Sequence, residues 1–328
     1  MELYLNTPGT YLHVKDQLFE VKVKKDGVEQ KHHFAAKKIK TIILATRAAL
    51  STDAVQLALM HNVDIVFVQH DGHPFGRVWH SKLGSTTKIR KRQLEVSLNR
   101  EGLTIVKDLI ARKITNQLDF LKDLKKHRAK QAETIEESTK RLDSYLAKLQ
   151  ALEADHVAEV ADTIRGLEGS AGREYFGKLS QLLTQEHQFK GRSFRPAADP
   201  FNAFLNYAYG MLYSKVEKCL MIAGLDPYVG MLHRDDYNQV SFVFDFIEPY
   251  RIHADRVVYR LFTGKLVNKS HTDEITNGCS LNKAGKELLV GKFNPYMEEE
   301  KIRHNNRNLT RTHAMQLDAH QLANELIK

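Results

Sequence analysis

The chain has 328 residues, of which 42% are hydrophobic, so it is long enough to form two domains that each bury a core. Its 49 Lys and Arg residues against 40 Asp and Glu residues give a net charge of +9. This excess favours a polyanionic partner such as nucleic acid, although a basic cytosolic enzyme would have the same balance. No signal peptide follows Met1, and no apolar run approaches the ~18 residues of a membrane span. Cys219 and Cys279 form no disulfide framework and are expected to be free thiols, so we expect a cytoplasmic protein.

The first part of the chain, residues 3–79, has a mainly β pattern. Strands are predicted for short runs rich in β-branched or aromatic residues at 11–14, 18–24, 31–34, 39–44 and 64–68. Hairpin turns are predicted at Asp16-Gln17, Asp26-Gly27 and Asp71-Gly72. A helix is expected after its N-cap Ser51, and it makes residues 39–68 a candidate βαβ crossover.

A change of composition near residues 82–92 predicts the domain boundary. We expect an α+β protein with a β-rich domain over 1–84, a linker over 85–92 and an all-helical domain over 93–328. Beyond Arg256, residues 268–286 are expected to be rich in loops and residues 298–328 to form a polar helix. The basic run at the boundary offers candidate contacts to DNA phosphate, although solvated charge at the start of a helix explains it nearly as well: Lys88, Arg90 and Arg92.

Metal-competent side chains appear at suitable spacings only between residues 206 and 256. A helix is predicted for residues 202–223, ending at Gly224, with Glu217 at the boundary of its apolar face and Lys215 pointing away from that face. His233 lies in the loop that follows.

A second, nearly fully buried helix is predicted from Ser241, and Asp245 and Glu248 share one of its faces at i, i+3 spacing. Two carboxylates in such a helix repel each other unless a cation or a hydrogen-bond network compensates. An imidazole with two or three carboxylates is a candidate divalent-metal site. The alternative is a solvated Glu217, a structural His233 and an Asp245 that only complements the positive end of its helix.

The order of these elements resembles the CRISPR-associated endonuclease and integrase family that acquires spacers. The matching runs are Asn206-Tyr207-Ala208-Tyr209-Gly210, Val216-Glu217, residues 223–233, residues 241–245 and Glu248-Pro249-Tyr250-Arg251. The Gly- and Ala-rich run 164–176 also resembles the family's small-residue motif ahead of a Tyr-Phe pair. The resemblance implies that Glu217, His233 and Glu248 bind a divalent ion, Mn²⁺ or Mg²⁺, with Asp245 beside them as a further catalytic residue.

The resemblance also implies a β-rich domain that dimerises, a helical domain that holds the metal, and a small ferredoxin-like CRISPR adaptation partner. The implied reaction is attack by a 3′-hydroxyl of double-stranded DNA on a phosphodiester of the CRISPR repeat; with water as nucleophile, the same site would be a nuclease.

Two other functions remain open. One is a metal-dependent nuclease or transposase-like integrase outside immunity. The other is a non-catalytic DNA-binding protein whose carboxylates only pair with Arg251 or Arg256.

The basic loop 189–196 interleaves aromatic residues with arginines, a pattern suited to nucleic acid but also to ordinary core anchoring. Arg192, Arg195 and Arg251 are therefore further candidate DNA contacts. Gly172 to Lys178 comes close to a phosphate-binding loop, but Leu179 replaces the required Ser or Thr, so we expect no ATP binding.

Overall fold

The computed structural model describes residues 1–25, 28–79, 86–233 and 239–328. The chain divides into two compact units, Met1–Leu83 and Gly84–Lys328. The predicted turn at Asp26-Gly27 lies outside the described residues. Within the described ranges, no helix is both long and apolar enough to cross a membrane.

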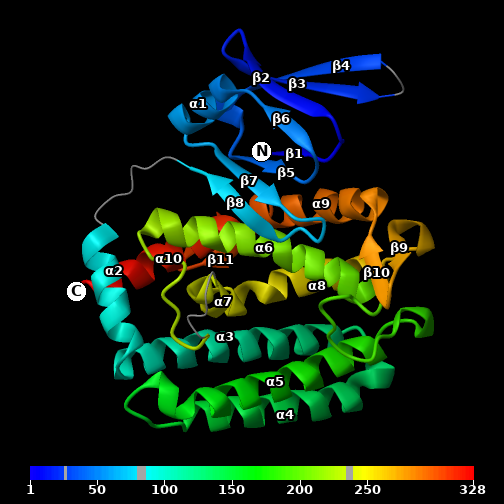
Figure 1. The fold of residues 1–328 in the computed structure, drawn as a ribbon. Coiled ribbons are helices and arrows are strands. Elements are labelled where there is room, and N and C mark those ends of the chain that lie inside the picture. Colours follow the sequence, from blue (N-terminus) through cyan, green and yellow to red (C-terminus); the bar gives the residue numbers. More distant parts are fainter. Residues whose placement is uncertain (26–27, 80–85, 234–238) are drawn as a thin grey trace. The chain divides into compact units, whose positions relative to one another are not determined.

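The described residues of the first unit form two four-stranded sheets and one α-helix (Figure 1). One sheet has the order β1 (Glu2–Leu5), β5 (Thr41–Leu44), β7 (Asp64–Val68), β8 (Pro74–Val78). The other has the order β4 (Val28–Ala35), β3 (Leu18–Lys25), β2 (Thr10–Lys15), β6 (Ala48–Leu50). The helix α1 (Thr52–Met60) begins at Ser51, whose side chain accepts a hydrogen bond from the Ala54 N–H.

Local patterns of the sequence account for this unit. The predicted βαβ crossover is confirmed, because β5 and β7 are parallel neighbours and α1 lies between them in the chain. The hairpin between β2 and β3 is confirmed as well: Asp16 and Gln17 have φ values of 51° and 61°, which polar turn residues adopt more readily than others. Buried side chains from both sheets and the helix, including Leu12, Ile42 and Ala54, form one core.

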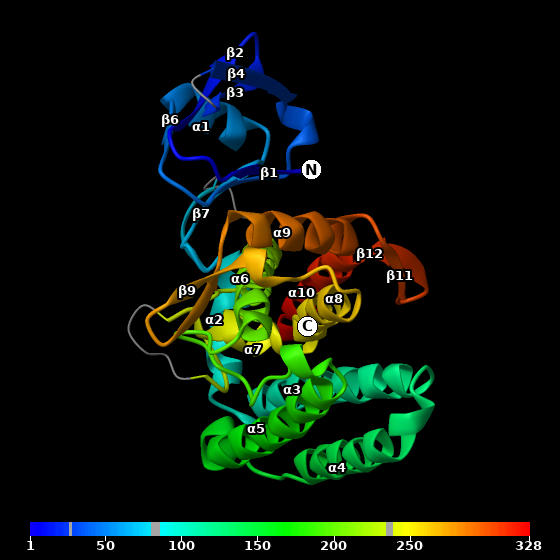
Figure 2. The same ribbon diagram turned by 90° about the vertical axis from the view of Figure 1, so that its right-hand side faces the viewer.

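The second unit is mainly helical. Its helices are α2 (Thr86–Ser97), α3 (Arg100–Lys125), α4 (Ala132–Gln150), α5 (Val157–Gln181), α6 (Pro200–Ala223), α7 (Ser241–Phe246), α8 (Arg251–Thr263), α9 (Lys283–Glu298) and α10 (Arg311–Leu326). Short 3₁₀ turns include η2 (Ala129–Gln131) and η4 (Glu248–Tyr250). Figures 1 and 2 show α3, α4 and α5 as one layer and α6, α8 and α10 as a second, with α9 on the far side of the second layer.

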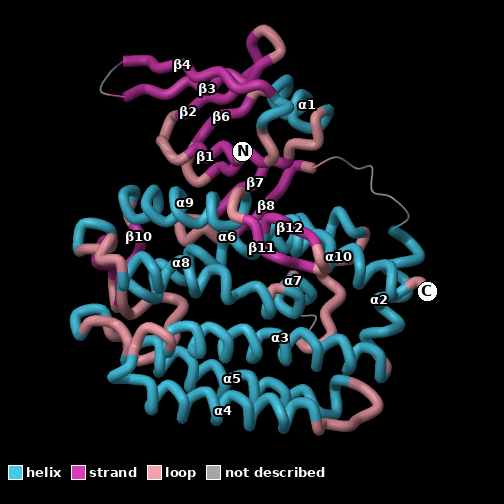
Figure 3. The backbone as a smooth tube through the Cα atoms, turned by 180° about the vertical axis from the view of Figure 1, so that it is seen from behind, coloured by secondary structure: helices cyan, strands magenta, loops and turns pink. Residues whose placement is uncertain are grey.

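Two expectations for this unit are wrong. Residues 86–92, expected in a linker, belong to α2, whose buried Ile89, Gln93 and Val96 recur at helical spacing. The unit is also not entirely helical, because it contains two antiparallel hairpins, β9 (Thr272–Ile275) with β10 (Gly278–Leu281) and β11 (Lys301–His304) with β12 (Arg307–Thr310). Figure 1 labels β9 beside β10, and Figure 3 shows β11 beside β12.

The hairpins form where asparagines provide the turns. Asn277, Asn305 and Asn306 all have positive φ, the left-handed conformation that Asn tolerates. The segment expected to be a polar C-terminal helix therefore starts with a hairpin, and its helix α10 buries Ala314, Met315 and Ala319.

The helix α6 is buried along most of its length. Asp199 caps its first turn by accepting the Asn202 N–H at 2.8 Å, and Gly224 ends it with φ 83°. Lys215, expected to point away from the apolar face, is 7% exposed and pairs with Glu298 of α9 at 2.8 Å. Neighbouring helices cover this face of α6, so the charge needs a buried partner.

Candidate active site

The α-helix that carries Asp245 ends before it reaches Glu248. The helix α7 stops at Phe246, and Glu248 begins the 3₁₀ turn η4. Pro249 explains the break, because proline lacks an N–H and its ring would clash with the carbonyl four residues earlier, that of Asp245. The expectation that Asp245 and Glu248 share one α-helical face is therefore wrong, and each carboxylate has its own set of partners.

The carboxylate of Asp245 organises the loop 231–233. Asp245 is 2% exposed, and its Oδ2 accepts the N–H groups of Met231 at 2.6 Å and Leu232 at 3.1 Å. Its Oδ1 accepts the His233 N–H at 3.1 Å and lies 2.6 Å from the His233 Nδ1. A carboxylate on Nδ1 makes that nitrogen the donor, which leaves Nε2 as the basic nitrogen of the neutral ring.

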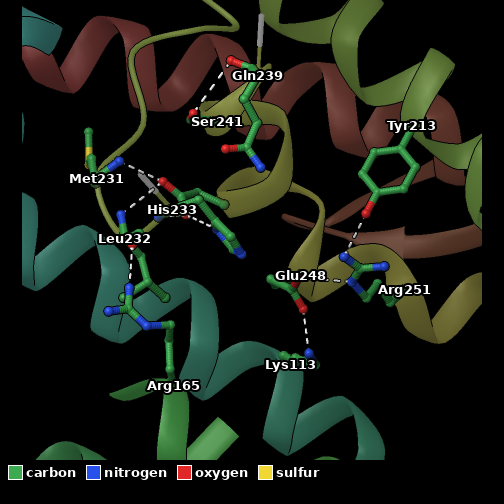
Figure 4. Close-up of polar contacts among 11 residues, drawn as sticks. Lys113, Arg165, Tyr213, Met231, Leu232, His233, Gln239, Ser241, Glu248 and Arg251 are labelled. Atoms are coloured by element: carbon green, nitrogen blue, oxygen red, sulfur yellow. Dashed lines mark hydrogen bonds and ion pairs between the residues drawn. The ribbon is translucent and has the colours of Figure 1, made fainter. Parts of the chain in front are cut away.

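Two further contacts fix the same loop. Arg165 of α5 donates from Nη1 to the Leu232 carbonyl at 3.0 Å, which ties the loop to a second helix (Figure 4). A Cβ at Gly230 would lie 2.5 Å from the Ser241 Cβ and 2.8 Å from the His233 carbonyl oxygen. No residue with a side chain fits there without movement, so the loop closely approaches the start of α7.

Glu248 is buried between two cations. It is 5% exposed, with Oε1 at 2.9 Å from the Arg251 Nε and Oε2 at 2.5 Å from the Lys113 Nζ. Arg251 also donates to the Tyr213 hydroxyl of α6 at 2.8 Å (Figure 4). Burial raises the pKa of Glu248, but the charges of Arg251 and Lys113 outweigh it and lower that pKa to about 2. The group is therefore ionised at neutral pH.

The ammonium of Lys113 joins a second carboxylate to this group. Lys113 of α3 also forms an ion pair with Glu168 of α5, so the carboxylates of Glu168 and Glu248 face the same Nζ atom. Burial lowers the pKa of Lys113, but the two carboxylates outweigh it and raise that pKa. Glu168 lies one helical turn after Arg165 and thus on the side of α5 that binds the His233 loop.

The sequence reasoning missed both Lys113 and Glu168. A signal for Glu168 was present, because it lies within the small-residue run 164–176 that resembles the family motif. The glycines of that run indicate a place of close helix approach, but nothing in the run distinguishes Glu168 from its other carboxylate, Glu174. No local pattern marks Lys113, which belongs to an ordinary amphipathic stretch of α3.

Another contact chain anchors the turn η4 from the C-terminal helix. Asp318 of α10 accepts the Tyr250 hydroxyl at 2.6 Å and the Arg112 Nη2 at 2.8 Å. Its other oxygen lies 2.8 Å from the Nε2 of His304 in β11. The turn that carries Glu248 is thus held by α3 and α10 together.

The predicted metal ligands do not form a ready ligand set. Glu217 is half-buried on α6, one turn after Tyr213. Among the residues that the structure describes, no three His, Cys, Asp or Glu side chains gather closely enough to hold a metal ion. The structure pairs His233 with Asp245, and it joins Glu248 to Glu168 through Lys113.

The chemistry of the side chains nevertheless suits a hard divalent ion. Carboxylate oxygens with one imidazole nitrogen are ligands for Mn²⁺ or Mg²⁺. Glu168 and Glu248 already share one positive group, the Lys113 ammonium. A divalent ion at this pair of carboxylates therefore requires Lys113 to shift.

Three predicted DNA contacts lie on α2. Lys88 is exposed and donates to the Ile327 carbonyl at 3.3 Å. Arg90 lies 3.7 Å from Asp226, and Arg92 lies 2.7 Å from Glu101. The two carboxylates neutralise part of the basic run, and DNA contact by the three residues stays a prediction.

The other three predicted DNA contacts differ in exposure. Arg192 donates to the Asn206 side chain at 2.7 Å, and Arg195 lies over the Phe194 ring at 4.8 Å, while both remain exposed. Arg251 has only 17% of its side chain exposed, and Glu248 and Tyr213 occupy it. Its observed role is to hold Glu248, as the non-catalytic alternative expects, whereas Arg256 pairs with Asp123 at 3.0 Å instead.

The fold and the site define an α+β protein in which a β-rich unit precedes a helical unit with buried carboxylates and a histidine-bearing loop. Residues 3–295 match the family model of the CRISPR associated protein Cas1. The chain therefore belongs to the Cas1 family of CRISPR-associated endonucleases, and the resemblance found in its sequence is confirmed.

Individual Cas1 proteins support this assignment. The CRISPR-associated endonuclease Cas1 1 of Archaeoglobus fulgidus is 31% identical over 320 residues, which cover 94% of this chain and 91% of the relative. A solved Cas1 structure from Thermotoga maritima has a TM-score of 0.81 at 20% identity and covers 100% of this chain and 97% of that one. A chain of a Cas6-RT-Cas1–Cas2 complex has a TM-score of 0.79 at 21% identity and covers 99% of this chain and 35% of that one. The predicted α+β fold class, with a β-sheet region ahead of a helical region, is confirmed.

Proposed function

We propose that this Cas1 protein inserts short DNA fragments into a CRISPR array by a metal-dependent attack of a DNA 3′-hydroxyl on a phosphodiester. Membership of a family of endonucleases supports a phosphodiester substrate. The single structural observation that carries the proposal is the convergence of three elements in the helical unit: the Asp245-bound His233 loop, the ionised Glu248, and Glu168 across Lys113. Because this strand transfer replaces one phosphodiester bond with another, it does not need the hydrolysis of a nucleotide as an energy source.

The residues have separate tasks in this proposal. Asp245 orients His233 and leaves its Nε2 as the basic nitrogen. Arg251 and Lys113 keep Glu248 ionised inside the protein. A divalent ion, when bound, would neutralise the charge that develops on the phosphate and help align the reacting oxygens. His233 and Glu248 would hold it.

The sequence and the structure indicate different residues as the third ligand of the divalent ion. The resemblance in the sequence assigned it to Glu217. We infer that Glu168 has this role, because it shares the Lys113 ammonium with Glu248 and follows Arg165, which binds the His233 loop. Glu217 is then a residue of α6 that supports the site from outside.

Two matched variants separate these assignments. We expect Glu168→Gln to weaken Mn²⁺ binding by at least about tenfold, because the loss of a carboxylate that only supports a metal ligand already weakens binding by about 10–100-fold. Glu217→Gln is expected to leave Mn²⁺ binding nearly unchanged, and the exposed Glu159→Gln on α5 is the control. Titration calorimetry gives binding, and a labelled-duplex assay gives strand transfer. The reverse pattern would return the role to Glu217.

The partners of the reaction belong to the same proposal. We propose that the protein is a cytoplasmic homodimer that binds double-stranded DNA together with a small ferredoxin-like adaptation partner. The similarity to a chain in a complex that includes Cas2 supports such an assembly. Light scattering of the protein alone and with the partner measures both steps. A monomer at assay concentrations, with unchanged mass after the partner is added, would refute this assembly.

A second candidate function is favoured by one observation. Glu248 pairs with Arg251, as a purely structural carboxylate in a non-catalytic DNA-binding protein would. Glu248→Gln and His233→Ala distinguish the two cases: strand transfer that is lost while DNA binding persists supports catalysis, and unchanged transfer refutes it. Integration of a linear duplex into a plasmid with and without a CRISPR repeat tests for an integrase outside immunity.

A further inference from the structure

An open cavity of about 730 Å³ lies at the C-terminal ends of α3 and α8, beside the turn η2. Its volume is in the range of small-ligand pockets, roughly 300–1,000 Å³. The cavity is distant from the candidate active site. Lys126 at its rim is 13 residues after Lys113, or roughly 20 Å along α3 at ~1.5 Å per residue.

The cavity is strongly basic. Its described lining contains one carboxylate, Asp123, and five Lys or Arg side chains, an excess of four positive charges: Lys126, Arg128, Lys130, Arg256 and Arg260. Asp123 lies 3.0 Å from both Lys126 and Arg256, and these contacts lower its pKa against the effect of burial. The remaining cations have no acidic residue in the cavity to neutralise them.

Two arginines are held in place by aromatic rings. The guanidinium of Arg256 lies 4.5 Å from the centre of the Phe120 ring, and that of Arg128 lies 5.8 Å from the Tyr259 ring. Arg128 also donates to the Leu182 carbonyl at 2.9 Å. Such contacts lower the entropic cost of using these side chains for a ligand.

Tyr259 adds a polar group with no assigned partner. Its side chain lines the cavity and is 2% exposed, and its hydroxyl has no hydrogen-bond partner among the described residues. A buried hydroxyl without a hydrogen-bond partner is destabilising, and a bound acceptor would remove that cost.

Basic residues near helix C-termini also complement the helix dipole, and this explains some of the charge. That effect does not require the cations to surround a cavity, nor two guanidinium groups to be fixed on aromatic walls.

We propose that this cavity binds the phosphate group of a nucleotide, with the cations as ligands of the phosphate and the aromatic wall beside the base or sugar. The nucleotide is either free or the 5′-phosphorylated end of a DNA strand.

The test compares two pairs of exposed lysines in the full chain. Lys126→Gln with Lys130→Gln removes two charges from the cavity, whereas Lys122→Gln with Lys140→Gln removes two exposed charges outside its lining. With adenosine 5′-monophosphate as probe in titration calorimetry, we expect the cavity pair to weaken binding by about tenfold or more, the scale of lost charge-assisted contacts. Equal binding by both pairs, or no binding to the unaltered protein, would overturn the proposal.

Competition experiments identify the source of the phosphate. A 5′-phosphorylated single strand that displaces the monophosphate, when the same strand without the 5′-phosphate does not, identifies a DNA end; failure of both strands identifies a free nucleotide. Displacement by both strands alike would overturn recognition of a terminal phosphate.

Tyr259→Phe is expected to weaken binding without unfolding the protein. The Glu248→Gln protein is expected to bind the monophosphate normally, so that failure of the integrase proposal and failure of this one are distinguishable.

Discussion

Replacing Lys113 with methionine tests whether its ammonium holds the position that a divalent ion would take. Methionine keeps much of the length of the side chain and removes the charge. Glu168 and Glu248 would then face each other with only Arg251 to compensate the buried Glu248.

The size of the effect follows from the geometry. At 2.5 Å between the Lys113 Nζ and the Glu248 Oε2, the Coulomb attraction is about 7 kcal/mol at an effective dielectric constant of about 20. Desolvation offsets much of it, and removing one member of a buried pair costs about 3–5 kcal/mol in practice. Because Arg251 still contacts Glu248, we expect the free energy of unfolding to fall by about 3 kcal/mol.

The informative measurement is the response of this variant to Mn²⁺. Ligand at a concentration 100 times its Kd stabilises the folded state by about 2.7 kcal/mol. We therefore expect Mn²⁺ to restore most of the lost stability of Lys113→Met, and to stabilise the unaltered protein less, because there the ammonium competes. Urea unfolding with and without Mn²⁺ gives both quantities, with Lys122→Met on the exposed side of α3 as the control.

Equal stabilisation of Lys113→Met and the unaltered protein by Mn²⁺ would refute this reasoning. In that case the ion binds elsewhere, or Lys113 does not compete with it. Loss of the Mn²⁺ effect on adding Glu248→Gln to the variant would support binding at the shared carboxylates.

Three further predictions follow from single residues. Asp245→Ala leaves the loop 231–233 without its acceptor, so at about 1–3 kcal/mol per unsatisfied group we expect at least ~3 kcal/mol of destabilisation and faster hydrogen exchange in the loop. Burial raises the pKa of Asp255 from 3.8 to about 6, so its contribution to stability is present below pH 3.8 and declines by about 3 kcal/mol as the pH rises to 6. Asp255→Asn is expected to remove this decline in urea midpoints, whereas the exposed Asp119→Asn keeps it. Gly224→Ala forces a left-handed conformation on a residue with a Cβ and is expected to cost about 1–2 kcal/mol by urea unfolding; an unchanged midpoint would contradict the strain.

Elements defined by neighbouring residues were predictable. The parallel pair β5 and β7 around α1 follows from two apolar runs and an N-cap, and α6 follows from its period and from Gly224. The hairpin β9–β10 was not predictable in this way, because β9 is mostly exposed and has no apolar alternation. Its position depends instead on tertiary contacts such as the Cys279 N–H donating to the Ala197 carbonyl at 2.9 Å.

The sequence predicts that the carboxylates of the candidate site need compensating partners, but it does not show which residues provide them. Two buried carboxylates close together in the sequence imply compensation, and the structure provides it in two forms: loop N–H groups and His233 for Asp245, and two cations for Glu248. One of those cations, Lys113, comes from a helix far earlier in the chain, and no spacing rule connects them. The pairing with Glu168 depends on it and was therefore invisible as well.

The contact of Asp318 with Tyr250 has a practical consequence for anyone who trims this protein for crystallisation or attaches a tag to its end. A truncation ahead of α10 would retain every acidic group proposed to bind an ion, and the amide and ring contacts of His233 would be untouched. It would nevertheless release Arg112 and Tyr250 from their shared acceptor and loosen the turn on which Glu248 sits. Loss of activity in such a shortened protein would result from the lost contacts between α10 and the turn η4, and not from the removal of a reactive group.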